Sequence, residues 1–303
     1  MKILKYLILI LFLTTSSLSK SQELYSYLLN DFAENNPAGL STINNYQLTL
    51  KAYGYNFEDG FIRAIVPIRK IQSRIGLSAE YYGYYDNELN DVKYNLSYSY
   101  SYLFSEKSYL AIGVKASLYR LRKAYSILIS NYLIEGDFKS DKFNFDVGIW
   151  FQNNNLGIGL SYNHINSPEH IGRYYYHSYK AVNIYKYEPE FNLMINHELK
   201  ISDRLKMKNN LFLYDIMYLH ERQEISINNI FSLNNTFSFG VTWDYFNYLK
   251  KELNLGFVMG FNLKDRYNIM FIDRFYEFES NKSFRNPTKR IHPGFECLFT
   301  VNI

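Results

Sequence analysis

Residues 92–104 alternate, except at Leu103, between two kinds of side chain, and this stretch is the clearest structural signal in the chain. One parity carries apolar and aromatic residues from Val92 through Tyr98 to Phe104, and the other carries lysine, asparagine and serine. Successive side chains of a β-strand point to opposite faces, so this strand has one apolar face and one small polar face. Its length suits a strand that crosses a bilayer at a tilt.

The same alternation recurs up to the C-terminus and predicts about fourteen strands, an even number as expected for a single-chain barrel. The expected strands are 47–56, 60–68, 73–84, 91–104, 108–121, 143–151, 155–165, 189–201, 205–218, 222–233, 235–247, 252–263, 265–277 and 291–302. Apolar residues would face lipid and polar residues the lumen. We therefore predict an all-β fold over residues 46–303: a transmembrane antiparallel outer-membrane β-barrel.

The connections between the expected strands are of two kinds. Residues 105–107 and 153–155 are short and polar, as in periplasmic turns. Residues 122–142 and 166–188 are longer and indicate extracellular loops or extensions of the strands. No linker or second domain is expected within the barrel.

The first 21 residues have the features of a cleaved signal peptide. Basic residues precede a short apolar run, and Ser19-Lys20-Ser21 offers a cleavage site before Gln22. Residues 22–45 lack the alternation and are expected to form an N-terminal segment at the periplasmic rim. Removing residues 1–21 removes three lysines and no acid, so the formal net charge falls from +4 to +1. Nothing in that balance favours a nucleic-acid partner.

The composition agrees with a barrel in an outer membrane. Aromatic residues make up 18% of the chain, carried almost entirely by 31 tyrosines and 23 phenylalanines. The mean hydropathy of −0.27 is low because only half of each strand would face lipid. No long apolar run follows the signal peptide, so no transmembrane helix is expected. The tyrosine clusters fit aromatic girdles, although stacking on a sugar would use the same residues.

Candidate catalytic and metal-binding chemistry is sparse. No two of the six histidines stand at metal-ligand spacing, and Ser161 and His164 differ in parity, so one strand would point them to opposite faces. His197 lies near a strand end. The single cysteine, Cys297, shares parity with Phe299 and is expected on the lipid face. We expect no enzyme activity, no cofactor and no metal.

The motif Asn36-Pro37-Ala38-Gly39 is the main candidate for a functional site. Proline fixes its own φ and biases Asn36 toward an extended conformation, while Gly39 permits a turn. Two roles are open at this point. The motif could form a chain-entry turn at the periplasmic rim, or it could form a plug or a docking element for a partner.

The N-terminal stretch from Leu24 to Gly39, which is rich in tyrosine and ends in this motif, resembles the opening of the PorP/SprF family of Bacteroidota outer-membrane proteins. Further similar segments are Gly76–Ser78, Leu96–Tyr100, Asp146–Gly148 and Gly159–Ser161. The resemblance covers nearly the whole mature chain. Asp31 stands where the family usually has proline, and the usual aromatic between the alanine and the glycine is missing.

The resemblance implies a non-enzymatic, multi-pass protein of the outer membrane that is associated with the type IX secretion system. The implied partners are a secreted protein with a C-terminal sorting domain, the periplasmic ring of the secretion machine, or both, besides outer-membrane lipid. The implied role is to anchor cell-surface cargo, gliding adhesins among them, or to assist its secretion. The alternative from the barrel pattern is a channel for small solutes.

Overall fold

The structure is a computed structural model that describes residues 32–54, 59–83, 89–129, 132–176, 179–186, 189–214, 223–248, 250–263, 266–278 and 290–303. The predicted signal peptide lies outside these residues. The described helices are α2 (Phe32–Asn35) and the 3-10 helices η1 (Pro37–Thr42) and η2 (Arg69–Ile71). Within the described part of the chain, no helix is both long enough and apolar enough to cross a membrane.

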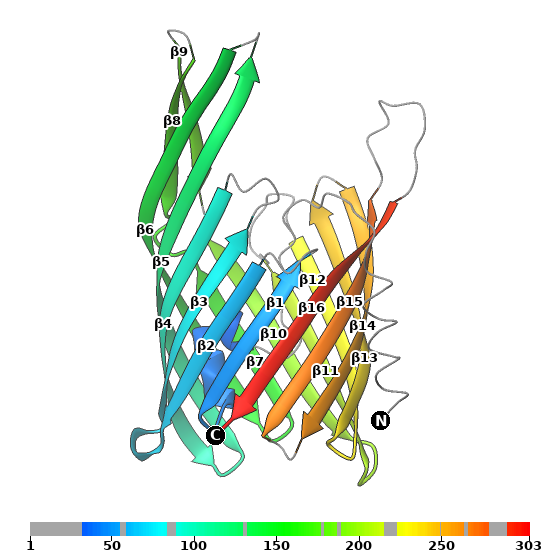
Figure 1. Cartoon of the computed structure of the whole chain (residues 1–303). Helices are drawn as coiled ribbons and strands as arrows, with labels where there is room; N and C mark the ends of the chain where they lie inside the picture. Colours follow the sequence, from blue (N-terminus) through cyan, green and yellow to red (C-terminus); the bar gives the residue numbers. More distant parts are fainter. Residues whose placement is uncertain are drawn as a thin grey trace.

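Fourteen antiparallel strands form one closed barrel, shown in Figure 1, and this confirms the predicted fold class. The barrel strands are β1 (Gln47–Gly54), β2 (Asp59–Ile68), β3 (Ser73–Gly83), β4 (Leu89–Ser105), β5 (Ser108–Ile129), β6 (Tyr132–Asn153), β7 (Leu156–Asn163), β10 (Glu190–Lys200), β11 (Leu205–Tyr214), β12 (Gln223–Leu233), β13 (Phe237–Tyr248), β14 (Lys250–Leu263), β15 (Tyr267–Phe278) and β16 (Arg290–Asn302). Strands β1 and β16 pair and close the wall.

The two long connections expected from the sequence are strand structures. Residues 122–142 extend β5 and β6 into a tall hairpin. The pair of Leu89, the first residue of β4, with Lys123 is the last contact of β5 with β4, and beyond it β5 and β6 pair only with each other. Residues 166–188 contain β8 (Glu169–Tyr176) and β9 (Tyr179–Lys186), a separate two-stranded sheet. Both hairpins project from the end of the barrel opposite the C-terminus (Figure 1). Since short turns mark the periplasmic end of such barrels, these hairpins lie on the extracellular side.

The alternation in β4 has the predicted orientation. Leu96 is 53% exposed on the outer face, whereas Ser97 and Ser99 are buried in the interior. In β16, Glu296 and Leu298 are buried inside, which places Cys297 on the outer parity, as predicted. The exposed apolar side chains thus form the lipid-facing surface of the barrel.

The lumen is less polar than the sequence pattern predicted. Six buried apolar side chains from β2, β12, β14, β15 and β16 form one cluster inside the barrel. They are Phe61, Ile230, Val258, Met270, Ile272 and Leu298. Val258 shares its parity with Asn254, Gly256, Gly260 and Asn262, a set that the alternation predicts to be polar and to face the lumen. The reason is that lumen side chains pack on one another, so apolar residues are tolerated on both faces of this part of the wall.

The lipid-facing assignment predicts a depth-dependent effect of charge. We expect Leu96→Arg, in the middle of β4, to lower the free energy of unfolding in a bilayer by about 2–4 kcal/mol. The matched control is Phe104→Arg, at the periplasmic end of the same outer face, which should cost only about 0–1 kcal/mol. Denaturant titration of the barrel folded into lipid vesicles measures both. Equal costs at the two positions would contradict the assignment.

Candidate functional site: an N-terminal insert in the lumen

Residues 32–44 lie inside the barrel, where the sequence had suggested a segment at its rim. Figure 1 shows this insert as the dark blue ribbon enclosed by the wall. Helix η1 contacts β3, β4, β5, β6 and β7. Asn36, Pro37, Ala38 and Gly39 are all buried. Sequence reasoning had left a rim turn and a plug as alternatives, and the geometry puts the four residues within the lumen.

The insert folds locally as the motif predicts. Asn36 is extended, with φ −135° and ψ 110°, and caps η1 by accepting a hydrogen bond on Oδ1 from the backbone N–H of Ala38 at 2.9 Å. Pro37 occupies the first turn, where its missing N–H is not needed. Gly39 serves close packing more than turn geometry, because a Cβ there would lie 2.6 Å from the backbone of Phe32. The two short helices can therefore pack against each other.

The buried amide of Asn36 joins the insert to two strands of the wall. Its Nδ2 donates to the carbonyl oxygen of Ile149 in β6 at 2.9 Å and to that of Leu160 in β7 at 3.2 Å. With Oδ1 bonded to Ala38, both ends of this amide are satisfied without exposure to water. A typical hydrogen bond contributes about 0.5–1.5 kcal/mol net, and an unmet buried group costs more. The side chain therefore specifies one position of the insert.

Glycines in the wall leave room for this approach. An added Cβ at Gly113 would fall on the backbone of Pro37 and Ala38, and one at Gly148 would fall on Oδ1 of Asn36. At Gly159 it would lie 2.7 Å from Nδ2 of Asn36. These three glycines come from β5, β6 and β7, and their missing side chains let Asn36, Pro37 and Ala38 approach the backbone of the wall.

Polar side chains of the wall hold the rest of the insert. Lys115 on β5 is buried, donates to the carbonyl oxygen of Glu34 at 2.9 Å and pairs with Asp146 at 2.8 Å. At the far end, Arg74 donates from Nε to the carbonyl oxygen of Ile43 at 3.1 Å. These contacts satisfy insert carbonyls that the short helices cannot pair internally.

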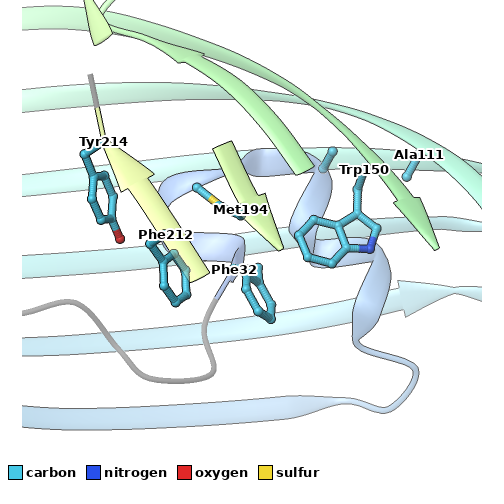
Figure 2. Close-up of a cluster of buried hydrophobic side chains, with 7 residues drawn as sticks. Phe32, Ala111, Trp150, Met194, Phe212 and Tyr214 are labelled. Carbon is cyan, nitrogen blue, oxygen red and sulfur yellow. The ribbon is translucent and has the colours of Figure 1, made fainter. Parts of the chain in front are cut away.

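An aromatic cluster anchors the start of the insert, as Figure 2 shows. The ring of Phe32 lies 4.8 Å from that of Trp150 and stacks on Phe212 at 5.2 Å between ring centroids. Met194 of β10 completes the contact. Gly157 and Gly159 leave room for the indole of Trp150, which covers both. Sequence reasoning missed these partners, since Trp150 and Phe212 look like ordinary strand residues.

Of Ser161 and His164, only His164 departs from the predicted placement. Ser161 is buried in the lumen, but β7 ends at Asn163 and His164 adopts a left-handed φ of 56°. The His164 ring consequently lies 6.1 Å from the lumen-facing ring of Tyr119, not on the outer face. His197 is half-buried near the end of β10. Among the described residues, no group of three histidine, cysteine or acidic side chains is gathered as a metal site.

Comparison with known proteins identifies the class. The chain matches the family described as type IX secretion system membrane protein PorP/SprF over residues 35–292, and it therefore belongs to that family. It is a barrel of the outer membrane. The motif Asn36–Gly39 falls within the matched region. No curated protein matches the chain.

Several solved structures share the fold at low identity. A Pseudomonas aeruginosa FadL homologue has 12% identity and a TM-score of 0.54, over 89% of this chain and 93% of that one. The CymD monoaromatic hydrocarbon channel has 9% identity and a TM-score of 0.57, over 93% and 95%. The Pseudomonas putida toluene transporter TodX has 10% and 0.54, over 90% and 93%. At such identities the likeness concerns the barrel fold alone.

The close approach of Asn36 to Gly148 predicts that a single added methyl group at this glycine lowers the stability of the protein. We expect Gly148→Ala to destabilise the protein by about 1–3 kcal/mol, because the new Cβ meets the buried Asn36 amide and something must shift. Cleavage of the purified barrel by chymotrypsin near Phe32 and Leu40 should become faster, as followed by mass spectrometry.

The matched control for this substitution is Gly60→Ala in β2. A Cβ there would have its nearest neighbour, the carbonyl oxygen of Lys51, at 3.8 Å, so nothing needs to move. Stability should stay the same or rise by about 0.4–1 kcal/mol. If both variants released the insert equally, the fit of Asn36 to the wall would not be what holds it.

Proposed function

We propose that this barrel is a non-enzymatic accessory of type IX secretion that anchors cell-surface cargo or assists its export. The observation that carries the proposal is the buried insert, fastened to five strands of a barrel that belongs to the secretion family. A barrel whose lumen is occupied by its own chain is suited to act as a fixed platform. Its partners would be a secreted protein with a C-terminal sorting domain, components of the periplasmic ring, or both.

The motif Asn36–Gly39 would act as the core of a plug. This role is supported by its complete burial and by the two carbonyl groups that Asn36 engages. The same arrangement gives the insert a defined position relative to the wall. Docking of a partner could then be sensed through the N-terminal segment.

The cargo-facing surface would be the pair of tall hairpins. The β5–β6 extension and the β8–β9 sheet reach beyond the rest of the wall on one side (Figure 1). The wall does not need β8 and β9, because β7 pairs directly with β10 through eight residue pairs from Glu190–Asn163 to His197–Leu156. An element that is dispensable for closing the barrel is available for binding.

The alternative is a channel for small solutes, since CymD is a monoaromatic hydrocarbon channel and TodX a toluene transporter. The occupied lumen disfavours this role. We expect the wild-type barrel to give no steady single-channel current in a planar bilayer. The Gly113→Ala, Gly148→Ala double variant should show openings, because both methyl groups would meet the insert, whereas Gly60→Ala should stay silent. Steady current through the wild-type barrel would favour the channel.

Retention of cargo tests the proposal itself. Deleting the gene in the native host should release at least one protein with a sorting domain from the cell surface, and the intact chain should restore retention. A chain in which a short glycine–serine turn replaces residues 169–186 should still insert, yet restore retention poorly. Surface proteomics measures both effects. Unchanged retention and export of every such cargo after deletion would contradict the proposal.

A further inference from the structure

The periplasmic mouth of the lumen is lined by lysines on two neighbouring strands. In β10 the buried residues Asn192 and Met194 face inward, so Asn196, Glu198 and Lys200 share the inward parity. In β11, Asn210 and Phe212 are buried and face inward, which assigns the same direction to Lys206 and Lys208. The side chains of these charged residues are one-third to two-thirds exposed at the mouth.

The register brings like charges together. Lys200 lies directly opposite Lys206, and Glu198 lies opposite Lys208. Like charges opposite each other in a sheet destabilise it, and one carboxylate, that of Glu198, serves both Lys206 at 3.6 Å and Lys208 at 3.7 Å. The ion pair of Lys200 with Asp203 is highly exposed and therefore weak. The cluster keeps an excess of positive charge toward the lumen.

The outer face at the same depth is apolar. Leu199 and Ile201 are 43% and 54% exposed on the opposite parity, and Leu199 lies across from Met207. This face suits contact with acyl chains. A lipid headgroup would meet the outward side chains first, so the inward lysines are placed for a molecule that enters the mouth from the periplasm.

The described part of the periplasmic rim is basic, although the chain without its predicted signal peptide is nearly neutral. The described turns and strand ends there carry nine basic and three acidic side chains. The basic ones are Arg69, Lys70, Arg74, Lys107, Lys200, Arg204, Lys206, Lys208 and Arg266, and the acidic ones are Glu106, Glu198 and Asp203. A one-sign field at a mouth attracts a partner of opposite sign and speeds its association.

Inward-facing residues of β10 and β11 connect the lysines at the mouth with the insert. Above them, Asn196 donates to Asn210 at 2.6 Å, and Met194 lies opposite Phe212. Phe212 then stacks on Phe32 at the start of the insert. A chain that binds along the inner face of β10 and β11 would therefore end next to the element that fills the lumen.

We propose that the Glu198–Lys200 end of β10 and the Leu205–Lys208 end of β11 form a docking site for an acidic segment of a periplasmic protein. The occupant is an extended stretch rich in aspartate or glutamate, matched to Lys206 and Lys208 on alternate positions of β11 and to Lys200, which lies across from Lys206 on β10. The site extends the periplasmic part of the proposed function by giving the partner a chemistry and an entry point.

Binding of a fluorescein-labelled hexaglutamate peptide to the full barrel in nanodiscs tests this site. We expect binding that weakens as salt is raised, because the contacts are solvent-exposed charges. Lys206→Glu with Lys208→Glu should weaken it by about tenfold. The matched control, Arg69→Glu with Lys70→Glu, makes the same change of charge in the β2–β3 turn and should alter binding by less than about twofold. A hexaglutamine peptide should not bind.

Three results would overturn the site: no binding of hexaglutamate, an equal loss in both charge-reversed variants, or capture of phosphatidylglycerol vesicles in place of the peptide through the same lysines. Circular dichroism and heat-modifiable migration in gels confirm that each variant is folded. The peptide assay does not involve cargo, so loss of the site and loss of cargo retention are separable. A host strain that carries the Lys206→Glu, Lys208→Glu chain then shows whether export depends on it.

Discussion

The buried amide of Asn36 is the constraint on which the lumen depends. It donates to backbone carbonyls of two adjacent strands and accepts from Ala38, so the observed position of the insert satisfies both ends of the amide. That geometry is possible only because Gly113, Gly148 and Gly159 leave out their side chains where the insert approaches. A hydrogen-bonded polar group in a dry interior specifies position more strongly than apolar contact does.

The insert and the apolar lumen cluster both fill space inside the barrel, each in a different part of it. A wall of this strand number encloses space that must hold water, side chains or an inserted segment. Near β5, β6 and β7 the insert fills that space, fixed by Lys115 and its partner Asp146. Near β12, β14, β15 and β16 the cluster around Val258 and Ile272 fills it. The barrel is packed from the inside in both regions, and its two ends differ in shape.

In the proposed function, the extracellular end and the periplasmic end of the barrel have different roles. On the extracellular side the β5–β6 and β8–β9 hairpins rise above the wall, and the direct pairing of β7 with β10 frees β8 and β9 from a role in closure. On the periplasmic side the turns are short, and lysines line the mouth next to Phe32. A secretion accessory that joins surface cargo to periplasmic machinery needs both kinds of surface on one immobile support.

The sequence by itself determined the fourteen barrel strands, most of their boundaries within a few residues and their lipid-facing sides, because alternation with period two is a local property of the chain. It did not determine how far β5 and β6 extend into the tall hairpin, nor the separate strands β8 and β9. It also determined the extended Asn36 before Pro37. Only the tertiary structure decided where the Asn36–Gly39 motif lies, since the hydrogen-bond partners of Asn36 in the wall, Ile149 and Leu160, are 113 and 124 residues away. It likewise decided that His164 turns inward and that part of the lumen is apolar, because both depend on packing across the barrel.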